Sequence, residues 1–197
     1  MKEKYVIVGN GIAAISAIDA IREVDQESEI IMFGSENHRP YNRISLSKNL
    51  LGTLTEEKLM LRKAEWYDKT QTKMFTDERV TSIQSGLNHI ETDGGKVVEY
   101  TKLLIATGSK SIQPSITGIH SPHVMTLKTF EDAQNILSDT EHMKQVAHIG
   151  GGIQGLEMAW ILSQLGKEVT LIELMGRLMP KQLDESSSKM LLSIIEK

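Results

Sequence analysis

Two glycine-rich segments of the same kind constrain the fold more than any other feature of the 197 residues. VGNGIAA, residues 8–14, and IGGGIQG, residues 149–155, each follow a short apolar run and precede apolar residues at helical spacing. A further apolar run comes after each helical stretch, at residues 29–33 and 168–172. Strand, glycine loop, helix and strand in this order form a βαβ unit, and such units build parallel sheets. The sequence therefore predicts an α/β protein with two such units.

The first loop has the pattern Gly9-x-Gly11-x-x-Ala14, which is typical of a dinucleotide-binding turn. Glycine at the first position allows the tight turn, and glycine at the second lets a pyrophosphate approach the backbone. A small third residue lets helix and strand pack closely. The N–H groups at the start of the helix favour an anion. Glu36 follows the second strand and offers a carboxylate to a ribose hydroxyl.

The second loop has the complete pattern Gly150-x-Gly152-x-x-Gly155. Its acid, Glu173, lies 23 residues after Gly150 and directly after a predicted strand. In that position a carboxylate binds a ribose 2′-hydroxyl and repels a 2′-phosphate, which favours NADH over NADPH. The nearby Arg177 leaves NADPH open as the less favoured alternative. Because hydride transfer between two dinucleotides needs both, the two loops predict a flavin at one and a nicotinamide at the other.

The segments between the two units predict further elements. Residues 79–84, 87–92 and 96–100 are interpreted as strands of a β-meander, with a hairpin turn at Asp93-Gly94-Gly95. Residues 55–75 have a patchy helical pattern with a short helix around residues 64–69.

The later segments predict the domain organisation. Residues 102–106 indicate another buried strand, and Pro114, Gly118 and Pro122 then interrupt the chain. Thr129, with Asp132 three positions on, is expected to cap a helix. We expect a first domain over residues 1–113, a linker over 114–123 and a second, partial domain over 124–197, which ends with an amphipathic helix at about 184–196.

Composition excludes several classes of partner. The net charge is −4 and the cationic residues are scattered, so nucleic acid is a poor partner. No apolar run approaches 18 residues and the first strand begins at Lys4, so we expect neither a membrane partner nor a signal peptide, and a cytoplasmic location. The absence of cysteine excludes disulfides, thiolate metal sites and thiol catalysis within this chain. His120 and His123 have no third ligand nearby, so we expect no metal site.

Five segments, taken in order, resemble a known family: VIVGNGIAA, GSENHRPYNRISLSKNLL, LLIATGSKSIQPSITG, GGGIQGLEMA and RLMPKQLDE. They are similar to the FAD-dependent pyridine nucleotide oxidoreductases, in the branch that holds NADH:rubredoxin and ferredoxin reductases and the large subunit of NAD(P)H nitrite reductase. The resemblance implies two Rossmann-like units in a three-layer fold, with a parallel sheet and a β-meander in the first and an incomplete second. Residues 1–113 would bind FAD and residues 124–197 NAD(P)H.

The resemblance also implies individual roles. The FAD residues would be Gly9, Gly11, Ala14, Glu36, Arg43, Lys48, Val80, Ala106, Thr107 and Gly108, and the NADH residues would be Gly150, Gly152, Gly155 and Glu173. Lys48 would lie beside the flavin N5 and Glu157 near the nicotinamide amide, and we expect these two catalytic residues to pair. A guanidinium such as that of Arg43 suits phosphate oxygens.

These roles imply an NADH-dependent reductase that passes hydride to FAD and electrons to a rubredoxin, a ferredoxin or a nitrite reductase centre. Relatives that work through a thiol have cysteine near the LSK segment, whereas this chain has none. We therefore expect an outside electron carrier or downstream redox centre as the acceptor.

The alternative is a non-catalytic nucleotide-binding fragment. Members of the family continue for roughly as many residues again, so we expect this chain to be an N-terminal fragment of a longer protein. The apolar face of the last helix and the open sheet edge also leave a homodimer open.

Overall fold

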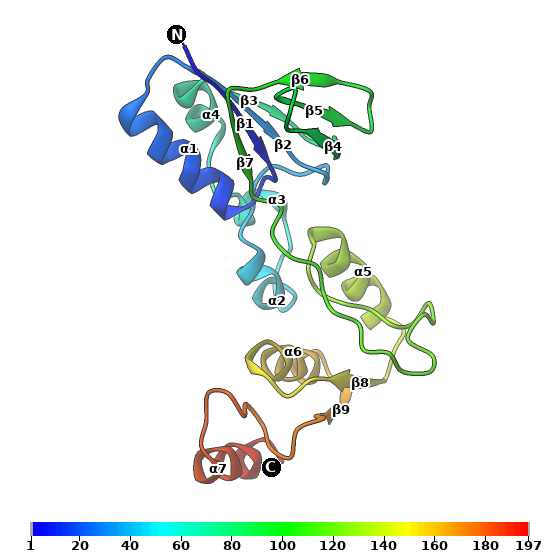
Figure 1. Cartoon of the computed structure of the whole chain (residues 1–197). Helices are drawn as coiled ribbons and strands as arrows, with labels where there is room; N and C mark the ends of the chain where they lie inside the picture. Colours follow the sequence, from blue (N-terminus) through cyan, green and yellow to red (C-terminus); the bar gives the residue numbers. More distant parts are fainter. Residues whose placement is uncertain (1, 197) are drawn as a thin grey trace. The chain divides into compact units, whose positions relative to one another are not determined.

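A computed structural model describes residues 2–196, and these fall into two compact units (Figure 1). The first unit comprises Met1–Arg43 and Thr55–Ile112, and the second comprises Ile44–Leu54 and Gln113–Lys197. Sequence reasoning had placed residues 44–54 in the first domain. The assignment of a cofactor to each domain stays a prediction.

A four-stranded parallel sheet forms the centre of the first unit. Its strands stand in the order β3 (Thr72–Phe75), β2 (Glu29–Phe33), β1 (Lys4–Val8) and β7 (Lys102–Ile105). Helix α1 (Ile12–Val24) joins β1 to β2, which confirms the first βαβ unit. The α/β architecture with a parallel sheet is confirmed.

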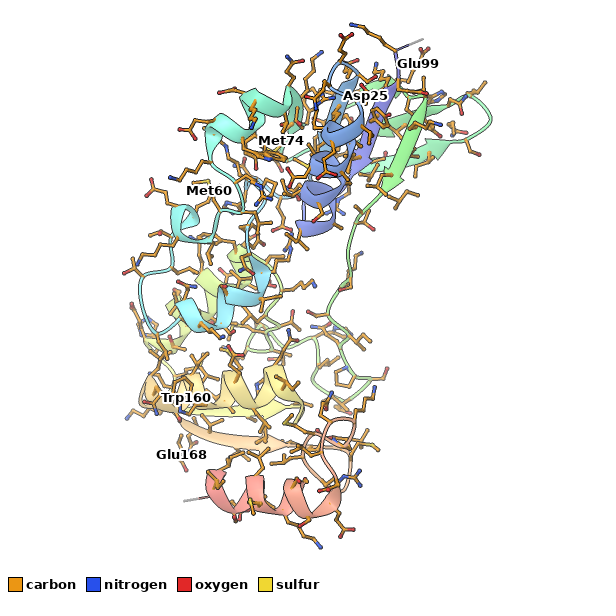
Figure 2. The ribbon with its side chains drawn as sticks, turned by 90° about the vertical axis from the view of Figure 1, so that its left-hand side faces the viewer. Asp25, Met60, Met74, Glu99, Trp160 and Glu168 are labelled. Atoms are coloured by element: carbon orange, nitrogen blue, oxygen red, sulfur yellow. The ribbon has the colours of Figure 1, made fainter. Side chains whose placement is uncertain are left out.

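Strands β1 and β2 are largely buried, and their successive side chains point to opposite faces of the sheet. Strand β7, which the sequence predicts to be buried, is mostly exposed. Ile7, Ile30 and Met32 pack with Ala14 and Ile18 of α1. In the same cluster lie Tyr67, from α4 (Ala64–Thr70), and Met74 of β3, which is labelled in Figure 2.

The opposite face of the sheet packs against three antiparallel strands, β4 (Val80–Gln84), β5 (His89–Thr92) and β6 (Val97–Glu99). Val6, Ile31 and Phe33 form a cluster with Ile90 of β5. Gly95 has a φ of +78°, the left-handed conformation that the predicted turn before β6 requires. The meander is confirmed, and with the helices and the parallel sheet it completes three layers.

The helical interpretation of residues 55–75 is wrong at its end. After the short helix α3 (Glu56–Leu59) and α4, the chain turns at Gln71, with φ +49°, and enters β3. Phe75 of β3 stacks on Phe33 of β2 at 5.1 Å between ring centroids. Only one residue separates α4 from this four-residue strand, so no period of two stands out from the helical pattern.

The second unit contains the other βαβ motif. Strands β8 (Gln145–Ile149) and β9 (Glu168–Ile172) pair in parallel, and α6 (Ile153–Gln164) connects them. Helix α5 (Phe130–Thr140) precedes this motif and α7 (Glu185–Ile195) follows it. A 3₁₀ turn (Arg43–Ser45) and helix α2 (Leu46–Asn49) complete the list of elements.

Two sequence expectations about these helices are confirmed. The Thr129 hydroxyl accepts the Asp132 N–H while the Asp132 carboxylate accepts the Thr129 N–H, a capping box at the start of α5. Helix α7 exposes Met190, Ile194 and Ile195. Within residues 2–196, the helices are too short or too polar to span a bilayer.

Candidate dinucleotide sites

The carboxyl ends of three adjacent strands bring most of the predicted FAD residues of the first unit together. Gly9 N–H donates to the Phe33 carbonyl at 2.8 Å, and Ala106 N–H donates to the Val8 carbonyl at 2.7 Å. The loops that follow β1, β2 and β7 therefore leave the sheet side by side. In open parallel sheets, ligands bind at this edge.

The glycine loop itself leaves room for an anion. Gly9 has a φ of +113°, and a Cβ on it would collide with the Ala106 carbonyl. Gly11 is the N-cap of α1, where no described side chain caps the helix. Apart from its chain neighbours, no described residue has an atom within 4 Å of a Cβ position on it. Ala14 is fully buried under the sheet. The free N–H groups and the open approach at Gly11 fit a pyrophosphate.

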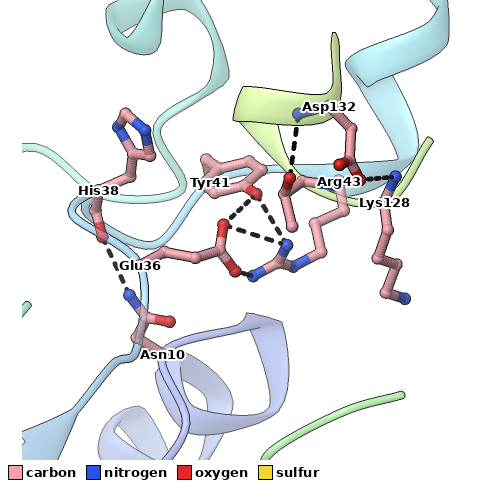
Figure 3. Close-up of polar contacts among 8 residues, drawn as sticks. Asn10, Glu36, His38, Tyr41, Arg43, Lys128 and Asp132 are labelled. Atoms are coloured by element: carbon pink, nitrogen blue, oxygen red, sulfur yellow. Dashed lines mark hydrogen bonds and ion pairs between the residues drawn. The ribbon is translucent and has the colours of Figure 1, made fainter. Parts of the chain in front are cut away.

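Glu36 and Arg43 are joined directly, whereas sequence reasoning gave them separate cofactor contacts. Arg43 Nη2 donates to Glu36 Oε1 at 2.5 Å (Figure 3). The buried Tyr41 links both: its hydroxyl donates to Glu36 Oε2 at 2.6 Å and accepts from Arg43 Nη1 at 2.7 Å. Sequence reasoning missed Tyr41, although it stands two residues before Arg43 in the PYNR segment. The pair fixes a carboxylate and a guanidinium beside each other.

The remaining predicted FAD residues of this unit lie on two other segments. Val80 begins β4, and Ala106, Thr107 and Gly108 follow β7. Gly108, three residues after the end of β7, has a φ of +73°, a backbone conformation that favours glycine.

The second glycine loop repeats the arrangement at the carboxyl ends of β8 and β9. Gly150, with φ +115°, donates its N–H to the Ile172 carbonyl at 2.8 Å. Gly152 is the N-cap of α6, again without a capping side chain or any described atom within 4 Å of a Cβ position. A Cβ on Gly155 would collide with the Gly150 carbonyl. This loop thus also fits a pyrophosphate.

Backbone amides hold the acid of the second unit. The N–H groups of Met175 and Gly151 donate to the two Glu173 carboxylate oxygens at 2.7 and 2.5 Å. These bonds favour the carboxylate and lower the pKa of Glu173 below its ordinary value. The side chain therefore stays negatively charged beside the loop at neutral pH.

A cavity of about 350 Å³ is lined by the segment that follows this acid in the chain and by α7. Met175 and Leu178 give it an apolar lining, and Arg177 and Lys189 give it cationic groups. Arg177 Nη2 donates to the Pro180 carbonyl at 3.2 Å. Arg177, the cationic residue that keeps NADPH as an alternative in the sequence analysis, thus binds a backbone carbonyl.

Lys48 and Glu157, the predicted catalytic residues, both belong to the second unit. Lys48 lies on α2 and Glu157 on α6. Ser47 Oγ, next to Lys48 in the chain, donates to Glu157 Oε1 at 2.8 Å. No ion pair joins Lys48 to Glu157 in the part of the chain that the structure describes. Sequence reasoning missed Ser47, which lies in the same LSK segment.

Metal ligands are not clustered. Residues 2–196 contain no group of three or more His, Asp or Glu side chains that could hold a metal ion.

Two Rossmann-like units with their glycine loops are typical of dinucleotide-binding proteins. A family model described as pyridine nucleotide-disulphide oxidoreductase matches residues 3–197, and the chain belongs to this family. The chain is 35% identical over 196 residues to the assimilatory nitrate reductase electron transfer subunit of Bacillus subtilis (strain 168), covering 99% of this chain and 25% of that protein.

Two further comparisons agree with this assignment. The chain is 33% identical over 173 residues to the ferredoxin–NAD(+) reductase subunit of the benzene 1,2-dioxygenase system of Pseudomonas putida, covering 88% of this chain and 42% of that one. The crystal structure of NADH:rubredoxin oxidoreductase from Clostridium acetobutylicum matches with a TM-score of 0.87 and 25% identity, over 100% of this chain and 51% of that one. This chain thus spans between a quarter and a half of these relatives.

Proposed function

We propose that this chain carries the FAD site and the NADH site of an NADH-dependent flavoprotein reductase, which passes hydride from NADH to FAD. The observation that carries the proposal is the duplication of one arrangement. Each unit has an uncapped helix N-terminus, an open glycine at the N-cap and a carboxylate beside the loop. One such loop holds one dinucleotide, and hydride transfer from NADH to FAD needs both.

In the first unit, the proposed role of the loop is to bind the FAD pyrophosphate at Gly11 and the start of α1. Glu36 would accept a ribose hydroxyl, and Arg43, held at 2.5 Å from Glu36, would face the phosphates. Val80 and Ala106–Gly108 complete the proposed contacts. A bound flavin would supply two-electron uptake from a nicotinamide and one-electron release to a carrier.

In the second unit, we infer a preference for NADH over NADPH. The ionised Glu173 would accept a hydrogen bond from the ribose 2′-hydroxyl of NADH and would repel the 2′-phosphate of NADPH. The bond from Arg177 to the Pro180 carbonyl uses one of the N–H donors of that guanidinium. Gly150, Gly152 and Gly155 would contact the pyrophosphate.

Lys48 and Glu157 are proposed to act at the hydride-transfer face. Lys48 would place a cation where negative charge develops on a reduced ring. The Ser47 hydroxyl would hold Glu157, through the 2.8 Å bond, in place to accept from an amide.

The acceptor is proposed to be a small redox protein or a downstream redox centre. Relatives are named as an electron transfer subunit and as a ferredoxin reductase subunit, and this chain has no cysteine for thiol chemistry. A cytoplasmic location and homodimer formation stay predictions.

Anaerobic addition of nicotinamide nucleotide to the FAD-loaded protein tests the proposal. We expect NADH to bleach the visible absorption of the flavin. NADPH should do so at least about tenfold less efficiently, since a hydrogen bond to a charged group contributes about 1.5–3 kcal/mol. Glu173→Gln should narrow that ratio, whereas Glu168→Gln, in β9, should leave it unchanged. NADH binding without bleaching would contradict the reductase and favour the non-catalytic alternative.

A further inference from the structure

Asn10, the residue between the two glycines of the first loop, has a buried side chain with a specific contact. The residue is only 7% exposed. The amide Nδ2 donates to the His38 carbonyl at 2.9 Å (Figure 3). The bond joins the glycine loop to the segment that follows β2, 28 residues along the chain.

The Asn10 amide also packs directly against Gly34. A Cβ on Gly34 would meet the amide carbon and both terminal atoms of Asn10. Gly34 is itself fixed, because its N–H donates to the Phe75 carbonyl at 2.8 Å and its carbonyl accepts the Glu78 N–H at 2.9 Å. The amide therefore contacts a rigid surface on one side and an acceptor on the other.

The segment that Asn10 contacts carries the proposed cofactor residues. Glu36 precedes His38, and Tyr41 and Arg43 follow it. The far end of this segment is fixed elsewhere, since Asn42 N–H donates to the Leu59 carbonyl at 2.8 Å. The Asn10 bond is a link from this segment to the glycine loop at the start of α1.

The second unit has a corresponding link at the same loop position. There Gly151, between Gly150 and Gly152, donates its backbone N–H to Glu173 at 2.5 Å. In both units the residue between the two glycines thus connects the loop to the segment that carries the acid. The first unit makes the link with a side chain, so a substitution can remove it.

We propose that Asn10 is a positioning residue for FAD, which holds the segment of Glu36 and Arg43 at a fixed place relative to the pyrophosphate loop. It acts through these residues, because the Nδ2 bond fixes the position of the His38 backbone and that backbone fixes the position of Glu36. This proposal rests on the proposed function of the first unit.

The test compares FAD affinity, measured by quenching of flavin fluorescence, for the full chain and its variants. Asn10→Ala should weaken FAD binding about tenfold, as expected for loss of one buried hydrogen bond. Asn10→Ser, a smaller change that also cannot reach His38, should act in the same direction. Asn135→Ala, at an exposed position of α5, is the matched control and should stay within about twofold of wild type.

A double-mutant cycle separates positioning from a general loss of structure. If Asn10 acts through Glu36, Asn10→Ala should cost clearly less in a Glu36→Gln background than in wild type. FMN lacks the AMP part of FAD, including the ribose that Glu36 is proposed to contact, so Asn10→Ala should change the affinity for FMN less than that for FAD. Hydrogen exchange in β1 reports whether each variant is folded.

The outcomes have distinct meanings. Wild type that ignores FAD would overturn the proposed function and this proposal with it. Wild type that binds FAD, with Asn10→Ala and Asn10→Ser within twofold of it, would overturn this proposal alone, as would a fully additive cycle. Failure of both variants to fold would assign Asn10 a purely structural role and would also overturn it.

Discussion

The two glycine loops share a backbone pattern but hold their acids differently. In the first unit, the side chains of Tyr41 and Arg43 bind Glu36. In the second unit, the backbone N–H groups of Gly151 and Met175 bind Glu173. The acid of the first loop therefore depends on the identity of its neighbours, and the acid of the second depends on the course of the backbone.

The two loops also differ in the positions at which a Cβ atom would collide with a neighbour. At the first glycine, a Cβ on Gly9 would collide with the Ala106 carbonyl, whereas no described atom lies within 4 Å of a Cβ on Gly150. At the third position the difference is reversed, since the first loop accommodates a buried Ala14 and the second has no room beside Gly155. The two loops thus share one sequence pattern but have different steric constraints, which substitutions at the first and third positions can distinguish.

The largest expected effect is at Gly9. Gly9→Ala adds the strain of a φ of +113° to a collision with a backbone carbonyl, which together should cost about 2–5 kcal/mol in the first unit. Gly150→Ala has the strain alone and should cost about 1–3 kcal/mol in the second. Hydrogen exchange of β1 and of β8 measures the two units separately. Equal losses in the two variants would show that the contact with Ala106 is unimportant.

The next contrast exchanges the third residue of the loops. Gly155→Ala would press on the Gly150 carbonyl, which a side-chain rotation cannot relieve, and should cost about 1–3 kcal/mol. Ala14→Gly removes one buried methyl from α1 and gives the unfolded chain more backbone freedom. It should therefore lower the stability of the first unit by about 1 kcal/mol. Hydrogen exchange of the β8 and β1 amides again measures the loss of stability in each unit. A Gly155→Ala protein as stable as wild type would contradict the steric difference between the loops.

A smaller effect concerns acid stability. Because the folded state lowers the pKa of Glu173, its carboxylate stabilises the second unit above the ordinary pKa of about 4.3, and this contribution is lost as the pH falls through the lowered value. Glu173→Gln should therefore be less stable than wild type at pH about 7, and the difference should shrink as the pH falls below the ordinary pKa of the carboxyl group. Urea unfolding across this range measures it, with Glu168→Gln as the control for removing one charge. A pH-independent difference would contradict the assigned cause.

Sequence reasoning predicted the features that local spacing determines. Local spacing determines the strand before each glycine loop and the helix after it, the meander turn at Gly95 and the Thr129 capping box, because each depends on residues a few positions apart. Strand β3 was missed because four residues next to a helix carry too little periodicity. The side-chain network of the first acid was missed because it requires the exact path of residues 36–43.

Contacts between residues far apart in the sequence could not be predicted, because local spacing gives no information about them. Ser47 and Glu157 are 110 residues apart, and no spacing in the sequence indicates their hydrogen bond. The grouping of Ile44–Leu54 with the second unit also depends on packing of α2 against later helices. Resemblance to a family directed attention to Lys48 and Glu157, but only the structure shows that Ser47 contacts the glutamate.

The central claim is that the two loops hold two different nucleotides, and a crossed binding experiment tests it most directly. Gly11→Val and Gly152→Val each place a side chain where the structure leaves open space at the start of α1 or α6, so the fold should persist while the pyrophosphate is blocked. We predict that Gly11→Val abolishes calorimetric binding of FAD and retains that of NADH, and that Gly152→Val does the reverse. Loss of both ligands in one variant, or displacement of FAD by NADH in the wild type, would contradict the account.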